Sequence, residues 1–92
     1  MIRSFADKHT RRFFAGERVA RFGGFAEQAT RRLTVLDSAV DLGDLAVLRS
    51  NRFEALRGDR AGQYSIRINA QWRICFRWME DGPHDVEIVD YH

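Results

Sequence analysis

The sequence has one cysteine, one proline and no apolar run long enough to cross a membrane. A single cysteine, Cys75, cannot form an internal disulfide, which excludes the cross-linked scaffold of many small secreted domains. A membrane-spanning helix needs about 20 consecutive apolar residues, and an export signal needs a charged and then an apolar opening; the sequence shows neither pattern. We therefore expect a cytoplasmic protein with no membrane partner.

Lysine is also scarce, since fourteen of the fifteen basic residues are arginine. All fifteen lie at or before Arg77, and against eight acidic residues they give residues 1–78 a net charge of +7. Residues 79–92 hold five acidic residues and no Lys or Arg. Arginine binds phosphate bidentately and stacks on bases, so this composition suits a nucleic-acid partner. A coding bias towards arginine explains it equally well.

The length of 92 residues is enough for one hydrophobic core and not for two. Hydrophobic residues make up 45% of the chain and include seven Phe, which is sufficient to fill that core. We find no repeat, linker or low-complexity segment, so we predict a single domain that covers residues 1–92.

Helical patterns occupy the first half of the chain. Asp7 is a suitable N-cap for a first helix that ends at Gly16 and directs Phe13 and Phe14 into the core. A second helix is predicted over residues 25–40, because its apolar residues recur every three or four positions. These residues are Phe25, Ala29, Leu33, Leu36 and Val40.

In the second half the apolar residues recur at every second position, which is typical of strands. Turn-like residues at 69–71 and 81–83 join the strands, so we expect an antiparallel meander. Residues 41–50 are predicted as a connector with a short turn. The fold class is therefore α+β, with two N-terminal helices packed on a mainly antiparallel sheet. The predicted strands cover residues 1–5, 64–69, 72–78 and 86–91.

One predicted strand separates two kinds of side chain. Its apolar residues are expected to face the helices: Trp72, Ile74, Phe76 and Trp78. Arg73 and Arg77 then lie on the opposite face, near Arg67 of the neighbouring strand. Like charges on one face repel unless they meet anions. We expect Arg77 to pair with Asp85 or Glu87, whereas Arg73 is a candidate ligand of a phosphate.

Other candidate residues lie in the charged segment from Arg52 to Arg60 and at the end of the chain. The segment places Glu54 among cations beside a glycine turn, although such loops are often simply solvated. His92 directly follows a predicted strand, and a histidine held there can transfer protons near neutral pH. No grouping of His, Cys and carboxylates has the spacing of a metal site, and no glycine-rich phosphate loop is present. We expect neither a metal nor a cofactor.

These segments together resemble a known family. The run FEALRGDRAGQYSIRIN at residues 53–69 leads into WRICFRW at residues 72–78. With MIRSF at the start and VDYH at the end, the chain resembles the HigB-type toxins, the plasmid-maintenance killer branch of the RelE/ParE toxin superfamily. The resemblance covers essentially the whole chain, and the combination of the segments makes it specific.

The resemblance implies a RelE-like fold and the function of a type II toxin–antitoxin toxin. Such toxins are ribosome-dependent endoribonucleases, or mRNA interferases, that cut mRNA in the decoding site and inhibit translation without a metal. The implied partners are the ribosome, mRNA and a HigA-type antitoxin. This antitoxin carries a helix-turn-helix domain, through which the complex binds operator DNA.

The resemblance also implies the residues of the site. Arg73 resembles the phosphate-holding arginine, whereas Tyr91 and His92 resemble the C-terminal residues that contact a base and transfer protons. Glu54 and Arg57 occupy the loop from which other members present a basic residue. Four further residues are expected to bind RNA: Arg60, Arg67, Asn69 and Asp90.

The chain departs from the family pattern at three positions. Arg57 stands where lysine is common, and because arginine stays protonated, Glu54 or His92 must act as the general base. Ala70 stands where Asp or Gly is usual, which predicts a reshaped hairpin if the turn requires a positive φ. Asn69 stands near a position where some members use arginine.

These departures favour an alternative function from another class. The chain would then be a non-catalytic interaction toxin, such as a gyrase poison of the ParE branch, or a co-repressor with its antitoxin. The ending Asp90-Tyr91-His92 favours the nuclease, because a gyrase-binding protein has no need of a terminal proton carrier.

Overall fold

A computed structural model describes residues 1–90, and Tyr91 and His92 lie outside the described residues. The helices are α1 (Lys8–Phe14), α2 (Ala26–Ser38) and α3 (Leu42–Val47), with short 3₁₀ turns η1 (Ala20–Phe25), η2 (Arg49–Asn51) and η3 (Gly58–Arg60). The strands are β1 (Glu54–Ala55), β2 (Tyr64–Arg67), β3 (Trp72–Met79) and β4 (Gly82–Asp90). No described helix has the length and apolar composition that a membrane crossing requires.

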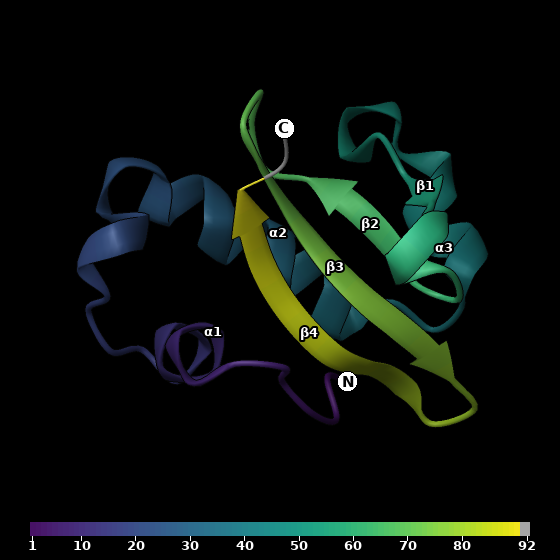
Figure 1. The fold of residues 1–92 in the computed structure, drawn as a ribbon, viewed down its shortest axis with the longest axis horizontal. Coiled ribbons are helices and arrows are strands. Elements are labelled where there is room, and N and C mark those ends of the chain that lie inside the picture. Colours follow the sequence, from purple (N-terminus) through teal and green to yellow (C-terminus); the bar gives the residue numbers. More distant parts are fainter. Residues whose placement is uncertain (91–92) are drawn as a thin grey trace.

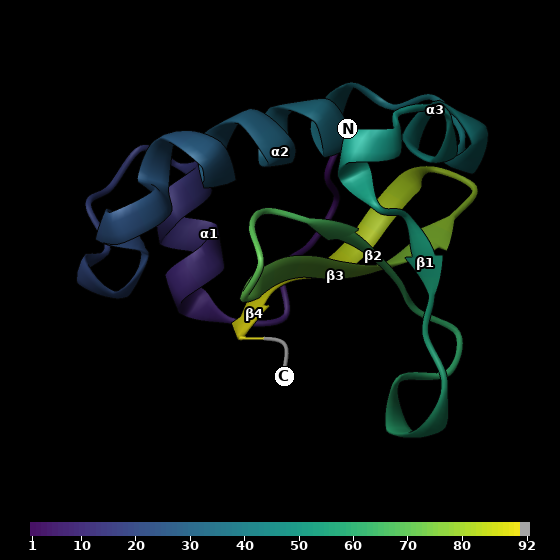
Figure 2. The same ribbon diagram turned by 90° about the horizontal axis from the view of Figure 1, so that it is seen from above.

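The four strands form one antiparallel sheet in the order β1-β2-β3-β4. Helix α2 lies across one side of this sheet, whereas the segment between β1 and β2 extends from the other side (Figures 1 and 2). The predicted antiparallel meander is therefore confirmed. The two-residue strand β1 was not predicted, because a pattern of alternation cannot be recognised in so short a segment.

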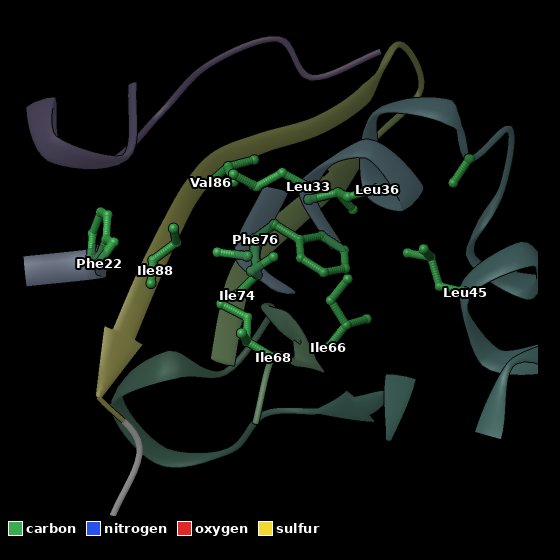
Figure 3. Packing of buried hydrophobic residues seen from close by; sticks show 12 residues of the cluster. Phe22, Leu33, Leu36, Leu45, Ile66, Ile68, Ile74, Phe76, Val86 and Ile88 are labelled. Carbon is green, nitrogen blue, oxygen red and sulfur yellow. The ribbon is translucent and has the colours of Figure 1, made fainter. Parts of the chain in front are cut away.

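The core lies between α2 and the sheet. Ile74 and Phe76 of β3 are fully buried, and they pack with Leu33 and Leu36 of α2 (Figure 3). Trp72 and Trp78 are half-buried against the same cluster. Burial of each large apolar side chain contributes about 1.5–3 kcal/mol. The prediction that the apolar residues of this strand face the helices is confirmed.

Helix α1 is amphipathic over two turns. Thr10 is buried and Phe13 packs edge-on against Phe22, at a ring-centroid distance of 5.4 Å. Phe14 is 38% exposed, so its prediction as a core residue was wrong: one residue further along a helix turns the side chain by about 100° away from the core. Asp7 precedes the helix but its side chain makes no capping hydrogen bond, contrary to prediction.

The other connections also differ in detail from the prediction. The second helix is shorter than predicted at both ends, because Phe25 belongs to the 3₁₀ turn η1 and Ala39 has an extended backbone. The predicted connector contains helix α3, which begins with a capping box between Asp41 and Asp44. The turn predicted at residues 81–83 was wrong, since β4 already begins at Gly82 and the turn itself is at residues 80–81.

The hairpin between β2 and β3 is organised by Asn69. Its side-chain oxygen accepts hydrogen bonds from the backbone N–H groups of Gln71 and Trp72, each at 2.9 Å. Within the described chain, positive φ angles of non-glycine residues occur at two other positions, so Ala70 does not adopt one. The condition for the predicted reshaping of the hairpin, a positive φ at Ala70, is therefore not met, and the side chain of Asn69 satisfies the turn.

The N-terminal segment is extended but does not form the predicted strand. It makes a single parallel bridge, between Phe5 and Val86. Backbone hydrogen bonds join Arg3 N to Pro83 O at 2.9 Å and Val86 N to Ser4 O at 3.1 Å. The next donor on this edge, Ile88 N, is bound at 3.0 Å by the hydroxyl of Thr10. A side chain thus continues the pairing where the backbone turns into α1.

This arrangement predicts that the Thr10 hydroxyl stabilises the fold. The isosteric substitution Thr10→Val leaves the buried N–H of Ile88 without an acceptor, which costs about 1–3 kcal/mol of unfolding free energy in urea titrations. Thr34→Val is the matched control, since Thr34 is exposed and bonds only within its own helix. That change is expected to stay within about 0.5 kcal/mol. Equal effects of the two substitutions would contradict the assignment.

Candidate active site

The side of the sheet that faces away from α2 carries three of the predicted site residues, Glu54, Arg67 and Arg73, and we call it the open face. Strand alternation places polar and charged side chains on it wherever the neighbouring positions point into the core. The open face comprises Glu54, Ser65, Arg67, Arg73, Cys75, Arg77, Asp85 and Glu87.

One row of side chains crosses all four strands on the open face. Glu54 pairs with Ser65, Ser65 with Cys75, and Cys75 with Glu87. The two outer residues are carboxylates, whereas the two central residues are fully buried despite lying on this face. The row is therefore covered by side chains from neighbouring positions, and the covering residues are arginines.

Arg73 covers the half of the row next to β1. Its Nε donates to Ser65 Oγ at 2.7 Å and lies 4.0 Å from Glu54 Oε1. Its Nη2 donates to the backbone oxygen of Arg52. The side chain is only 12% exposed, so it lies flat on the sheet as a fixed positive charge.

Arg67 stands directly opposite Arg73 in the register of β2 and β3. It is half-buried, and its Nε donates to the backbone oxygen of Asn69 at 3.0 Å. Like charges that face each other across two strands are destabilising. A bound anion offsets this repulsion, so the pair of arginines forms a suitable place for a phosphate group.

The other half of the row is covered by the loop that contains η3. Arg60 Nη1 lies 3.3 Å from Glu87 Oε1 and donates to Gln63 Oε1 at 3.0 Å. Arg77 Nε lies 3.5 Å from Asp85 Oδ2, which confirms the predicted cross-strand pair. The Arg60–Glu87 contact places the loop over the β4 side of the open face, while Arg73 occupies the β1 side.

The remaining predicted residues lie around this centre. Arg57 is exposed and, with Glu54, lines a shallow hollow of about 520 Å³ beside β1. The side chain of Asn69 binds the turn, and Asp90 accepts from Gln71 Nε2 at 3.0 Å at the end of β4. The RNA-binding roles of these residues remain predictions. Tyr91 and His92 were also predicted as site residues, and they lie outside the described part of the chain.

Two contributors were missed by the reasoning from the sequence. Ser65 alternates with the core residues of β2, so its face could have been predicted, but its bond to Arg73 depends on the strand register. No feature of the sequence indicates that the backbone oxygen of Arg52 accepts a hydrogen bond from Arg73. Among residues 1–90, no three His, Cys, Asp or Glu side chains come together in an arrangement that could hold a metal ion.

Comparison with known proteins identifies the family. A model described as the RelE-like toxin of type II toxin-antitoxin system HigB matches residues 3–92. The chain belongs to the HigB-like toxins. As a toxin of a type II system, it has an antitoxin as its partner.

Two relatives of this HigB-like toxin are similar along most or all of their length. Toxin HigB-1 of Vibrio cholerae serotype O1 is 34% identical over 82 residues, which cover 87% of this chain and 86% of that protein. Endoribonuclease HigB of Proteus vulgaris is 33% identical over 95 residues and covers 100% of both chains.

A solved structure supports the same fold. The YoeB-YefM complex from Staphylococcus aureus contains a chain that matches with a TM-score of 0.65 at 17% identity. The match covers 100% of this chain and 95% of the other. The prediction of a RelE-like α+β fold is confirmed.

The HigB-like toxin contains a thiol beneath its open face. Cys75 is fully buried, and this burial is the main cause that raises its pKa above the usual 9.0. Glu87 and Glu54 raise the pKa further, whereas Arg60 and Arg73 lower it. The thiol therefore stays protonated near neutral pH, which fits a packing role under the arginines better than a nucleophilic one.

The raised pKa predicts a loss of stability at alkaline pH. As the pH rises past 9.0, the unfolded chain releases the thiol proton while the folded chain retains it, so the free energy of unfolding falls. Urea titrations of the wild type and of Cys75→Ala between about pH 7 and pH 10 measure this effect. The stability advantage of the wild type is expected to shrink above the usual thiol pKa. A difference that does not vary with pH would contradict the prediction.

Proposed function

We propose that this toxin is an endoribonuclease that cuts mRNA on the ribosome and thereby inhibits translation. The observation that carries the proposal is the pair formed by Arg67 and Arg73 across β2 and β3, with Glu54 beside it. The two arginines are register partners on the same face of the sheet, and each is held by hydrogen bonds. The Proteus vulgaris relative, which is named an endoribonuclease, supports the same activity.

The proposal includes the partners of the toxin. The antitoxin is of the HigA type with a helix-turn-helix domain, and the toxin reaches operator DNA only through it. The ribosome supplies the mRNA substrate in the cytoplasm. Family membership supports an antitoxin partner, and the basic residues 1–78 support contact with RNA.

The chemistry proposed is transfer of the RNA phosphate to its own 2′-oxygen. The 2′-oxygen loses its proton and attacks phosphorus, and the bond from phosphorus to the 5′-oxygen breaks. The products are a 2′,3′-cyclic phosphate and a 5′-hydroxyl group, which takes up a proton. The reaction written in this way uses neither a metal nor a cofactor.

Arg73 and Arg67 stabilise the negative charge that accumulates on the non-bridging oxygens as the attack proceeds. A fixed cation acts most strongly where water is excluded and no reorganisation is needed. Arg73 meets both conditions, because it is mostly buried and is held by hydrogen bonds to Ser65 and Arg52. It is the main phosphate ligand in this proposal, with Arg67 as the second.

Proton transfer requires two further groups. Arg57 cannot accept a proton, because a guanidinium remains charged. In the proposal Glu54, which lies on the open face close to Arg73, accepts the proton of the 2′-hydroxyl. In the proposal His92 donates the proton to the 5′-oxygen and Tyr91 contacts a base. Asp90, two residues before His92, pairs with Trp72, which adjoins Arg73.

The role of Arg73 predicts a large loss of activity in Arg73→Ala. Loss of one preorganised group that stabilises developing charge costs about 10²–10³-fold in rate. Primer extension on purified translating ribosomes measures the cuts and their positions. Arg77→Ala is the matched control, because Arg77 lies on the same strand and face but pairs with Asp85. We expect it to change the rate much less.

Several results would contradict this assignment. Equal cleavage by the wild type and Arg73→Ala would exclude Arg73 as the phosphate ligand. An absence of cuts by the wild type on ribosomes, in a protein that still arrests growth, would favour a gyrase-type interaction toxin. An absence of both effects would favour a co-repressor.

The pH dependence of cleavage identifies the general base. The rate is expected to rise with pH while the general base loses its proton, and to fall again at higher pH where the general acid loses its own. Glu54→Gln and His92→Ala are compared in single-turnover assays over a range of pH. We expect Glu54→Gln to lose the acidic limb of the profile and His92→Ala to lose the alkaline limb. An acidic limb that persists in Glu54→Gln and vanishes in His92→Ala would assign the base to His92.

A further inference from the structure

Arg73 is held by a contact that the proposed reaction does not itself require. Ser65 is a fully buried polar residue, and its hydroxyl accepts the Nε–H of Arg73 at 2.7 Å. The backbone oxygen of the same serine lies 3.5 Å from Nη2. Ser65 therefore contacts one edge of the guanidinium group from beneath.

A second contact comes from an unusual backbone conformation. Arg52 has φ 45° and ψ 50°, which is the left-handed region that residues with a side chain rarely adopt. The turn η2 holds it there through the bond from Arg52 N to Arg49 O at 3.0 Å. In this conformation the oxygen of Arg52 accepts the Nη2–H of Arg73.

The two acceptors have a joint effect on the guanidinium group. Nε and Nη2 belong to the same rigid plane, so acceptors on both atoms fix the rotation of that plane as well as its position. The acceptors come from β2 and from the residue that follows η2, and β2 and η2 contact each other. A lysine at position 73 would carry a single ammonium group and could not be oriented in this way.

We infer that the Ser65 hydroxyl and the Arg52 backbone oxygen are positioning groups that orient the Arg73 guanidinium for the scissile phosphate. This inference rests on the proposed function, in which Arg73 is the phosphate ligand. Neither group touches the RNA. They act through Arg73. The left-handed conformation of Arg52 directs its backbone oxygen towards the guanidinium group.

Two kinds of variant test the inference. Ser65→Ala removes the hydroxyl that accepts from Nε. At position 52 the backbone oxygen cannot be deleted, but its direction can be changed: asparagine tolerates the left-handed region, whereas valine disfavours it. Arg52→Asn and Arg52→Val both remove the charge, so their difference reports the backbone conformation alone. Arg52 is exposed, so both variants are expected to fold.

The assay is cleavage on purified translating ribosomes, with kcat and KM determined separately for wild type, Arg73→Ala and the three variants. We expect Ser65→Ala to lower kcat about 10- to 100-fold, the size of a misplaced catalytic group, with KM unchanged. Arg52→Val is expected to have a lower kcat than Arg52→Asn. The Arg73 Nε–H signal in NMR spectra should exchange with water faster in Ser65→Ala than in wild type.

The outcomes separate this inference from the proposed function. Wild-type cleavage by Arg73→Ala would overturn the role of Arg73 and the inference with it. Loss of cleavage in Arg73→Ala, with an unchanged kcat in folded Ser65→Ala and equal rates in the two Arg52 variants, would overturn the inference alone. An effect confined to KM would also overturn it. If Ser65→Ala does not fold, the comparison of Arg52→Asn with Arg52→Val decides.

Discussion

Strand β3 carries the core and the candidate site on its two sides, and the alternation of its side chains is the constraint on which the rest depends. Ile74 and Phe76 are buried against α2, while Arg73 lies on the open face. A shift of the register by one residue would exchange the two sets. The shifted register would bury the guanidinium of Arg73 in the core without a partner, at a large cost in free energy. The apolar contacts that fold the protein therefore also fix the position of Arg73.

The charged residues of the open face form two kinds of arrangement, ion pairs and a pair of facing arginines. Arg60 with Glu87 and Arg77 with Asp85 are partly exposed ion pairs, which typically contribute only about 0–1 kcal/mol. The Arg60–Glu87 pair joins the loop that contains η3 to β4, whereas the Arg77–Asp85 pair joins β3 to β4. On the β1 side, two arginines face each other in register, an arrangement that favours a bound anion.

The edges of the sheet are closed in a way that holds β4. Backbone bonds from the N-terminal segment pair with its first half, and the Thr10 hydroxyl binds the next donor. An unprotected edge would be open to pairing with other chains. At the other end of the described part of β4, Asp90 pairs with Trp72 of β3.

Periodicity in the sequence was sufficient to predict α2, β2, β3, the meander and the face on which Arg73 lies, but it placed the start of β4 at Val86 instead of Gly82. Periodicity is a local property, so it can be read along the chain. The resemblance in residues 53–78 and at both ends was sufficient to predict the family. The tertiary structure alone decided the contacts that refine the site. Arg73 meets Ser65 and Arg52, and Thr10 meets Ile88, because strand register and packing bring together residues that are far apart in sequence.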